Sequence, residues 1–81
     1  MSGQREVEID DLTDEETELF YEAVQTFRGV STRQSFHSVP VRDGDDALSA
    51  VRIYWSSDDA KPAATISIVR NSAGQIGFEV R

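Results

Sequence analysis

A helical pattern of apolar residues occupies the segment from Asp14 to Arg28. Thr13 and Glu16 have the spacing of a capping box, in which each side chain bonds a free backbone N–H at the helix start. Five apolar residues then fall within an arc of about 140° on a helical projection, and these are Leu19, Phe20, Ala23, Val24 and Phe27. We therefore expect a helix with one buried stripe that ends near Gly29, because glycine readily adopts the left-handed terminating conformation.

Beyond the helix, apolar and polar residues alternate, which is typical of strands with one buried face. This pattern predicts four strands, over residues 36–42, 48–56, 63–70 and 75–81. Pro40 cannot donate a ladder hydrogen bond, so we expect the first of these strands at an edge. The turn signals at Asp43-Gly44 and 71–74 favour hairpins between neighbouring strands.

Together these elements predict an α+β fold, with one N-terminal helix packed on one face of a four-stranded antiparallel meander sheet. A single domain is expected over residues 12–81. Residues 1–11 form an acidic N-terminal arm, which is either a short strand, as the alternation of Val7 and Ile9 suggests, or disordered.

The expected core combines the helix stripe with the inward positions of the strands. Its members are Leu19, Phe20, Val24, Phe27, Val39, Val41, Val51, Ile53, Trp55, Ile66, Ile68, Ile76, Phe78 and Val80. Phe36 and Val39 cannot both face inward without a bulge, because side chains alternate between the two faces of a strand. The outer face of the sheet is expected to carry Arg42, Arg52, Tyr54, Val69 and Arg81.

The formal charge of −7 is concentrated at one end of the chain. Residues 1–27 contain nine acidic residues and one basic residue, a net charge of −8, whereas residues 28–81 have a net charge of +1. Seven of the eight basic residues are arginine. Low lysine with abundant acidic residues is similar to the composition of proteins from salt-loving archaea or high-GC bacteria, so the acidity alone does not identify a partner.

Several classes of function are disfavoured by what the sequence lacks. Without cysteine there are no disulfides, thiolate metal sites or cysteine nucleophiles. No apolar run approaches the ~18 residues of a membrane span, and the polar, acidic N-terminus is unlike a signal peptide. We therefore expect a cytoplasmic protein that does not enter membranes. No phosphate-binding loop or nucleophile elbow is present, so neither a cofactor nor enzymatic activity is expected.

Two weak signals for site chemistry remain. His37, the one histidine, could serve as a general base or pH switch, although a lone histidine on a strand is usually a surface residue. The carboxylates of Asp43–Asp46 resemble part of a cation-binding loop, but aspartate and glycine are also favoured by a hairpin turn. A small hydrolase or metal-dependent enzyme built on these residues is the least favoured hypothesis.

The leading hypothesis is a non-enzymatic interaction module, such as a regulator, inhibitor or adaptor. Its acidic helix face would engage a protein with a basic surface, through Asp14, Glu15, Glu18 and Glu22. An alternative is a nucleic-acid-binding sheet that uses Arg42, Arg52, Tyr54 and Arg81, although the net negative charge makes nucleic acid an unfavourable partner. A further alternative is that the acidity serves only salt adaptation. The open sheet face could also form a homodimer through Tyr54 and Val69.

Overall fold

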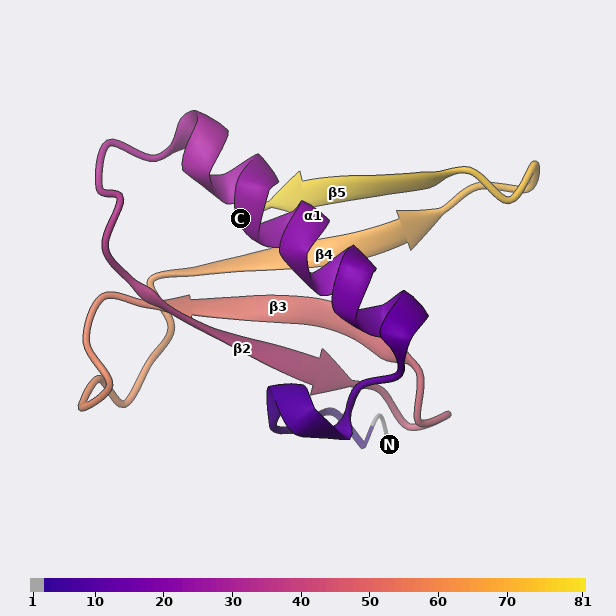
Figure 1. Ribbon diagram of the computed structural model, residues 1–81, viewed down its shortest axis with the longest axis horizontal. Coiled ribbons are helices and arrows are strands. Elements are labelled where there is room, and N and C mark those ends of the chain that lie inside the picture. Colours follow the sequence, from indigo (N-terminus) through magenta and orange to yellow (C-terminus); the bar gives the residue numbers. More distant parts are fainter. Residues whose placement is uncertain (1–2) are drawn as a thin grey trace.

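The computed structural model describes residues 3–81 and confirms an α+β architecture, one helix with an antiparallel sheet (Figure 1). The sheet has five strands rather than the expected four, in the order β1-β2-β3-β4-β5. The strands are β1 (Arg5–Glu6), β2 (His37–Arg42), β3 (Leu48–Tyr54), β4 (Ala64–Arg70) and β5 (Ile76–Val80). Each strand pairs antiparallel with its neighbour in sequence.

Helix α1 (Asp14–Val30) begins as the sequence predicts and ends later. Both hydrogen bonds of the Thr13–Glu16 capping box are present. Gly29, however, lies inside the helix, and the chain leaves it at Ser31 in an extended conformation. The expected glycine termination is therefore wrong. The side-chain amide of Gln34 donates to the carbonyls of Arg28 and Ser31 and so satisfies acceptors near the helix end.

The core lies between α1 and the sheet, with the helix crossing the strands obliquely (Figure 1). Its buried members are Phe20, Ala23, Val24, Phe27, Leu48, Val51, Ile53 and Ile66. Phe27 packs against the rings of Phe36 and Trp55, with centroid distances of 5.0 Å and 5.9 Å. Ala23 and Leu48 were missing from the expected core, and Trp55 is only partly buried.

The side chains of strand β2 lie on the opposite faces of the sheet from those expected. Directly paired residues share a face of the sheet, and Val39 and Val41 pair with Arg52 and Ala50, away from the helix. Phe36 takes the inward position and packs against the core. Because Val39 faces outward, no bulge is needed between Phe36 and Val39. The register of β2 against β3 shifts instead at the far end of the strand, between Val41 and Arg42. Val41 is nevertheless only 1% exposed.

The inward side of β5 is only partly covered. Phe78 and Val80 pair with the inward residues Ile68 and Ile66 of β4, as expected, whereas Ile76 pairs with exposed Arg70. Ile76 and Val80 are nonetheless 40% and 37% exposed, so they are not core residues. The hairpin that joins β4 to β5 extends past α1 (Figure 1), and the helix therefore leaves its end uncovered.

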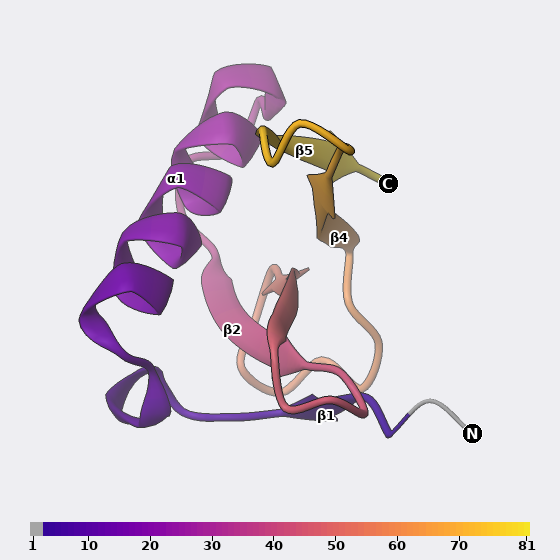
Figure 2. The same ribbon diagram turned by 90° about the vertical axis from the view of Figure 1, so that its right-hand side faces the viewer.

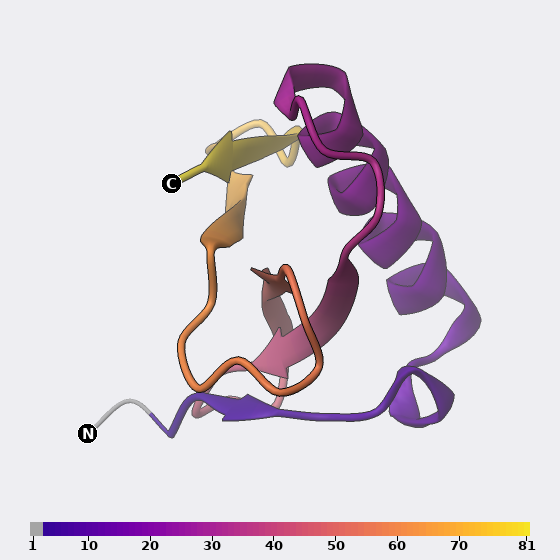
Figure 3. The same cartoon turned by 90° about the vertical axis from the view of Figure 1, so that its left-hand side faces the viewer.

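The N-terminal segment runs along the other edge of the sheet (Figures 2 and 3). Strand β1 pairs with the end of β2, and the 3-10 turn η1 (Ile9–Asp11) leads into the helix. The Val7 N–H donates to the Pro40 carbonyl over 3.0 Å. The backbone of Pro40 therefore faces the N-terminal segment, and its missing N–H costs no hydrogen bond to β3. The expectation that this strand lies at an edge is wrong, because β1 pairs with it on the side away from β3. The predicted arm is a short strand from residue 5, while its residues 1 and 2 lie outside the described residues.

Candidate functional site

Four carboxylates form an acidic helix face on α1. These residues are Asp14, Glu15, Glu18 and Glu22, and all four are exposed. Within residues 3–81, none of the four side chains takes part in an ion pair or hydrogen bond. Asp14, Glu18 and Glu22 are spaced four residues apart, so they form one stripe along the helix. The face is thus a row of like charges that the fold itself does not neutralise.

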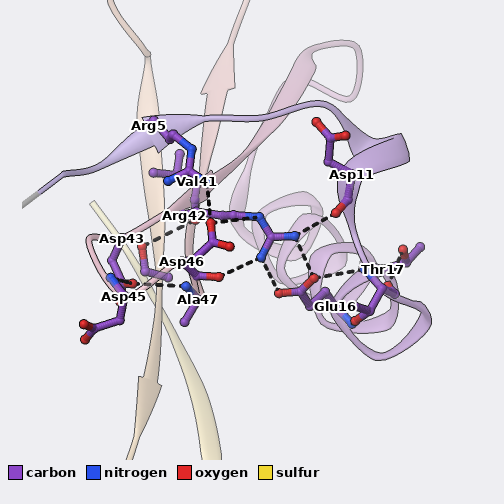
Figure 4. A network of polar contacts seen from close by, with 12 residues as sticks. Arg5, Asp11, Glu16, Thr17, Val41, Arg42, Asp43, Asp45, Asp46 and Ala47 are labelled. Carbon is purple, nitrogen blue, oxygen red and sulfur yellow. Dashed lines mark hydrogen bonds and ion pairs between the residues drawn. The ribbon is translucent and has the colours of Figure 1, made fainter.

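Glu16 is two residues from Asp14 and from Glu18, so it lies on nearly the opposite side of the helix from this stripe. It has a different role (Figure 4). Its carboxylate accepts two hydrogen bonds from the guanidinium of Arg42, at 2.7 Å and 2.9 Å. Arg42 also donates to the carbonyls of Asp11 and Asp46. The paired Arg42 lowers the pKa of Glu16 to about 2, and the pKa of Arg42 is raised in turn by Glu16.

The structure therefore removes Arg42 from the outer face of the sheet, where the sequence pattern had placed it. Arg42 pairs with inward-facing Leu48 across the register shift and is only 8% exposed. Its guanidinium links the first turn of α1 to the β2–β3 turn, so it is not available to a nucleic acid phosphate. No sequence signal distinguished Glu16 from its acidic neighbours except its place in the capping box.

On the outer face, Arg52 and Tyr54 converge on Glu6 from the N-terminal arm. Arg52 donates to the Glu6 carboxylate over 3.0 Å, and the Tyr54 hydroxyl bonds to the same oxygen. The bond from Tyr54, together with Arg52, lowers the pKa of Glu6, and the carboxylate of Glu6 raises the pKa of Tyr54. Sequence reasoning identified Arg52 and Tyr54 but missed Glu6, which is 46 positions before Arg52.

These three side chains line an open concavity of about 940 Å³, together with His37, Asp59 and Thr65 among others. His37 is directly opposite Tyr54 on the neighbouring strand and is exposed. The concavity therefore contains both positive and negative groups, and its arginine is already paired within the chain. Arg81, the fourth residue of the nucleic-acid hypothesis, is next to Glu79 at the C-terminal end and pairs with it over 3.1 Å.

The residues of the hydrolase hypothesis are not brought together. His37 begins β2, whereas the Asp43–Asp46 turn follows the other end of that strand. The carboxylate of Asp43 accepts hydrogen bonds from the backbone N–H groups of Asp45 and Ala47. Asp46, in a left-handed conformation with φ of 64°, pairs with Arg5. Asp43 and Asp46 thus have structural roles in the turn and its contacts.

Across residues 3–81, no three acidic or histidine side chains are grouped as the ligands of a metal ion would be. The same part of the chain contains no helix with the length and apolarity needed to cross a bilayer. No family model, curated protein or solved structure is significantly similar to this chain, so its function has to be inferred from its own residues.

Proposed function

We propose that this protein is a non-enzymatic interaction module that captures a partner with a basic surface through its acidic helix face. The observation that carries the proposal is the lack of internal neutralisation of Asp14, Glu15, Glu18 and Glu22, all exposed within the described chain. The fold uses Glu6, Glu16 and Asp46 in ion pairs, but leaves this row of carboxylates free.

The geometry of the face suits lysine and arginine side chains. A helix holds its carboxylates at fixed spacing, so a basic partner meets several of them without first ordering a loop. The acids near the helix start are also stabilised by the helix dipole, which offsets part of their mutual repulsion. Such a surface mainly raises the association rate and selects partners by charge, and both effects weaken as salt screens the charges.

The test compares two variants with the same change in net charge. In the first, Asp14→Asn, Glu15→Gln, Glu18→Gln and Glu22→Gln neutralise the acidic helix face. In the matched control, Glu8→Gln, Asp10→Asn, Asp45→Asn and Asp58→Asn neutralise four exposed carboxylates elsewhere. Each tagged protein is used for capture from an extract of its own source at low and physiological salt, and binding of any captured protein is then measured with purified components.

We expect the helix-face variant to lose the partner, with binding at least tenfold weaker, while the control retains it. Circular dichroism should show the same fold for all three proteins. Equal loss in both variants would mean that only total charge matters, as salt adaptation implies, and would overturn the proposal. Capture by all three proteins alike would also overturn it.

A further inference from the structure

The two edges of the sheet differ in how they are protected. Strand β1 has only two residues, both exposed and charged, which is a common way to prevent edge-to-edge pairing. Strand β5 has five residues, and within residues 3–81 no strand pairs with its other side. It contains no proline and directs no charged side chain toward the helix side. Glu79, on the outer face, is the one charged residue of β5, so this edge is less protected than β1.

The hydrogen-bonding groups of β5 alternate between its two sides. Arg81 exchanges two backbone hydrogen bonds with Thr65, and the Asn71 N–H donates to the Gln75 carbonyl. Odd-numbered residues of β5 thus bond to β4, so the N–H and C=O groups of Ile76, Phe78 and Val80 point toward the free side. The side chains of these same three residues lie on the helix side.

These features are complementary to a second copy of the same strand. An antiparallel pairing centred on Phe78 places Ile76 opposite Val80 of the other copy, and the outward backbone groups would form about six hydrogen bonds. Glu79 then lies opposite Gly77 rather than another acid, so no like charges are directly paired. The N-terminal arm lies at the opposite edge of the sheet, next to β2, whereas α1 crosses the sheet obliquely (Figure 1).

The position of the helix strengthens this complementarity. The C-terminal turn of α1 extends past β5 in both Figure 1 and Figure 2, and it carries Val30, which is 69% exposed. At the other end of β5, Ile76 is 40% exposed because no helix covers it. In the antiparallel pairing, each helix end would cover the Ile76 end of the other copy.

We propose that β5 pairs with β5 of a second copy, so that two sheets join across a twofold axis. This inference is independent of the proposed function, because the dimer leaves the acidic helix face exposed. An interface of one short strand is at the small end of stable interfaces, so we expect a weak dimer that forms only at high protein concentration.

The test measures the molecular mass by sedimentation equilibrium from about 10 μM to 1 mM. Val80→Pro removes an outward N–H without breaking the β4–β5 ladder, and Ile76→Lys places a charge opposite Val80 of the second copy. The matched control is Val69→Lys, at an equally exposed valine of the same hairpin that faces outward from β4. Thermal unfolding confirms that each variant is folded.

We expect a concentration-dependent dimer for the wild type and the control, with association at least tenfold weaker in both edge variants. The amide hydrogens of Ile76, Phe78 and Val80 should also exchange more slowly as the wild-type concentration rises. A wild type that is monomeric at 1 mM would overturn the proposal. A dimer unaffected by either edge variant would also overturn it, because the copies would then meet elsewhere.

Discussion

At the scale of single residues, Glu16 joins two structural roles. Its carboxylate caps the Thr13 N–H and also accepts from Arg42, whose side chain is largely buried. Removing one member of a buried ion pair leaves the other charge without compensation, which costs more than the pair contributes.

Glu16→Gln should lower the free energy of unfolding by about 2 kcal/mol. Glutamine still satisfies the capping box, so the loss reports the contact with Arg42 rather than the helix start. Urea denaturation measures this loss of unfolding free energy. The control is Glu15→Gln, at an exposed residue of the same turn, which should lose less than about 0.5 kcal/mol. The double variant Glu16→Gln/Arg42→Met should recover part of the loss, and an unaffected single variant would mean that the pair is not formed.

The same contact predicts an acid-sensitive stability. The pKa of Glu16 is lowered from 4.5 to about 2 in the folded protein. A carboxyl group whose pKa is lowered on folding stabilises the fold at pH values above its pKa in the unfolded protein. This contribution is lost as pH falls from 4.5 toward 2. Urea denaturation measures the free energy of unfolding at pH 5 and near pH 2.5. Between these two pH values it should fall by about 2 kcal/mol less in Glu16→Gln than in the wild type. An equal decrease in both proteins would contradict the assignment.

At the scale of elements, the helix was predictable because its signals are local. The capping box and the apolar stripe each lie within a few turns of one segment, and both are present in the structure. The faces of β4, β5 and most of β3 were also predicted correctly, because apolar and polar residues alternate along them. Leu48 is the exception in β3, because the register shift opposite Arg42 turns it inward.

The orientation of β2 could not be predicted in the same way. Its valines alternate as core residues would, yet Phe36 and the Arg42–Glu16 contact favour the opposite orientation. That choice depends on a residue of the helix 26 positions away, which no local pattern contains. For the same reason, the contacts of Glu6 with Arg52 and Tyr54 were not predicted, and Arg42 was assigned to the outer face of the sheet.

Packing of the helix on the sheet depends on Phe27. This ring is 5% exposed and contacts both Phe36 and Trp55. Phe27→Ala should therefore destabilise the protein by about 3 to 5 kcal/mol, which would unfold much of a domain this small. Thermal unfolding checks the prediction, with Tyr21→Ala as the control because Tyr21 is 54% exposed on the same helix. Similar melting of the two variants would contradict this account of the core.

At the scale of the whole molecule, the N-terminal arm connects the start of the chain to the centre of the sheet. Glu6 lies beside Val41 in the strand ladder and binds Arg52 and Tyr54 on β3. The concavity on the outer face is thus formed by the N-terminal arm together with residues between His37 and Thr65. Glu6 is the carboxylate of this concavity that binds its arginine.

Glu6→Gln should lower the pKa of Tyr54, because the negative carboxylate that holds the phenol protonated is gone. The ultraviolet absorbance of phenolate, followed as pH is raised, measures this change. Tyr54→Phe assigns the signal, since the two tyrosines of the chain are Tyr21 and Tyr54. An unchanged titration of Tyr54 would show that Glu6 does not reach it in solution.

The arm also has a consequence for the order of folding. The ladders from β2 to β5 join neighbouring segments, whereas the contacts of Glu6 close loops of 46 and 48 residues. Closing long loops is slow and entropically unfavourable, so the meander and helix should assemble first and the arm should dock last. Segments with few buried contacts also open locally below the global unfolding free energy. The arm should therefore open and close repeatedly while the helix and meander stay folded. At any moment, Arg52 and Tyr54 are then free of Glu6 in a small fraction of the molecules.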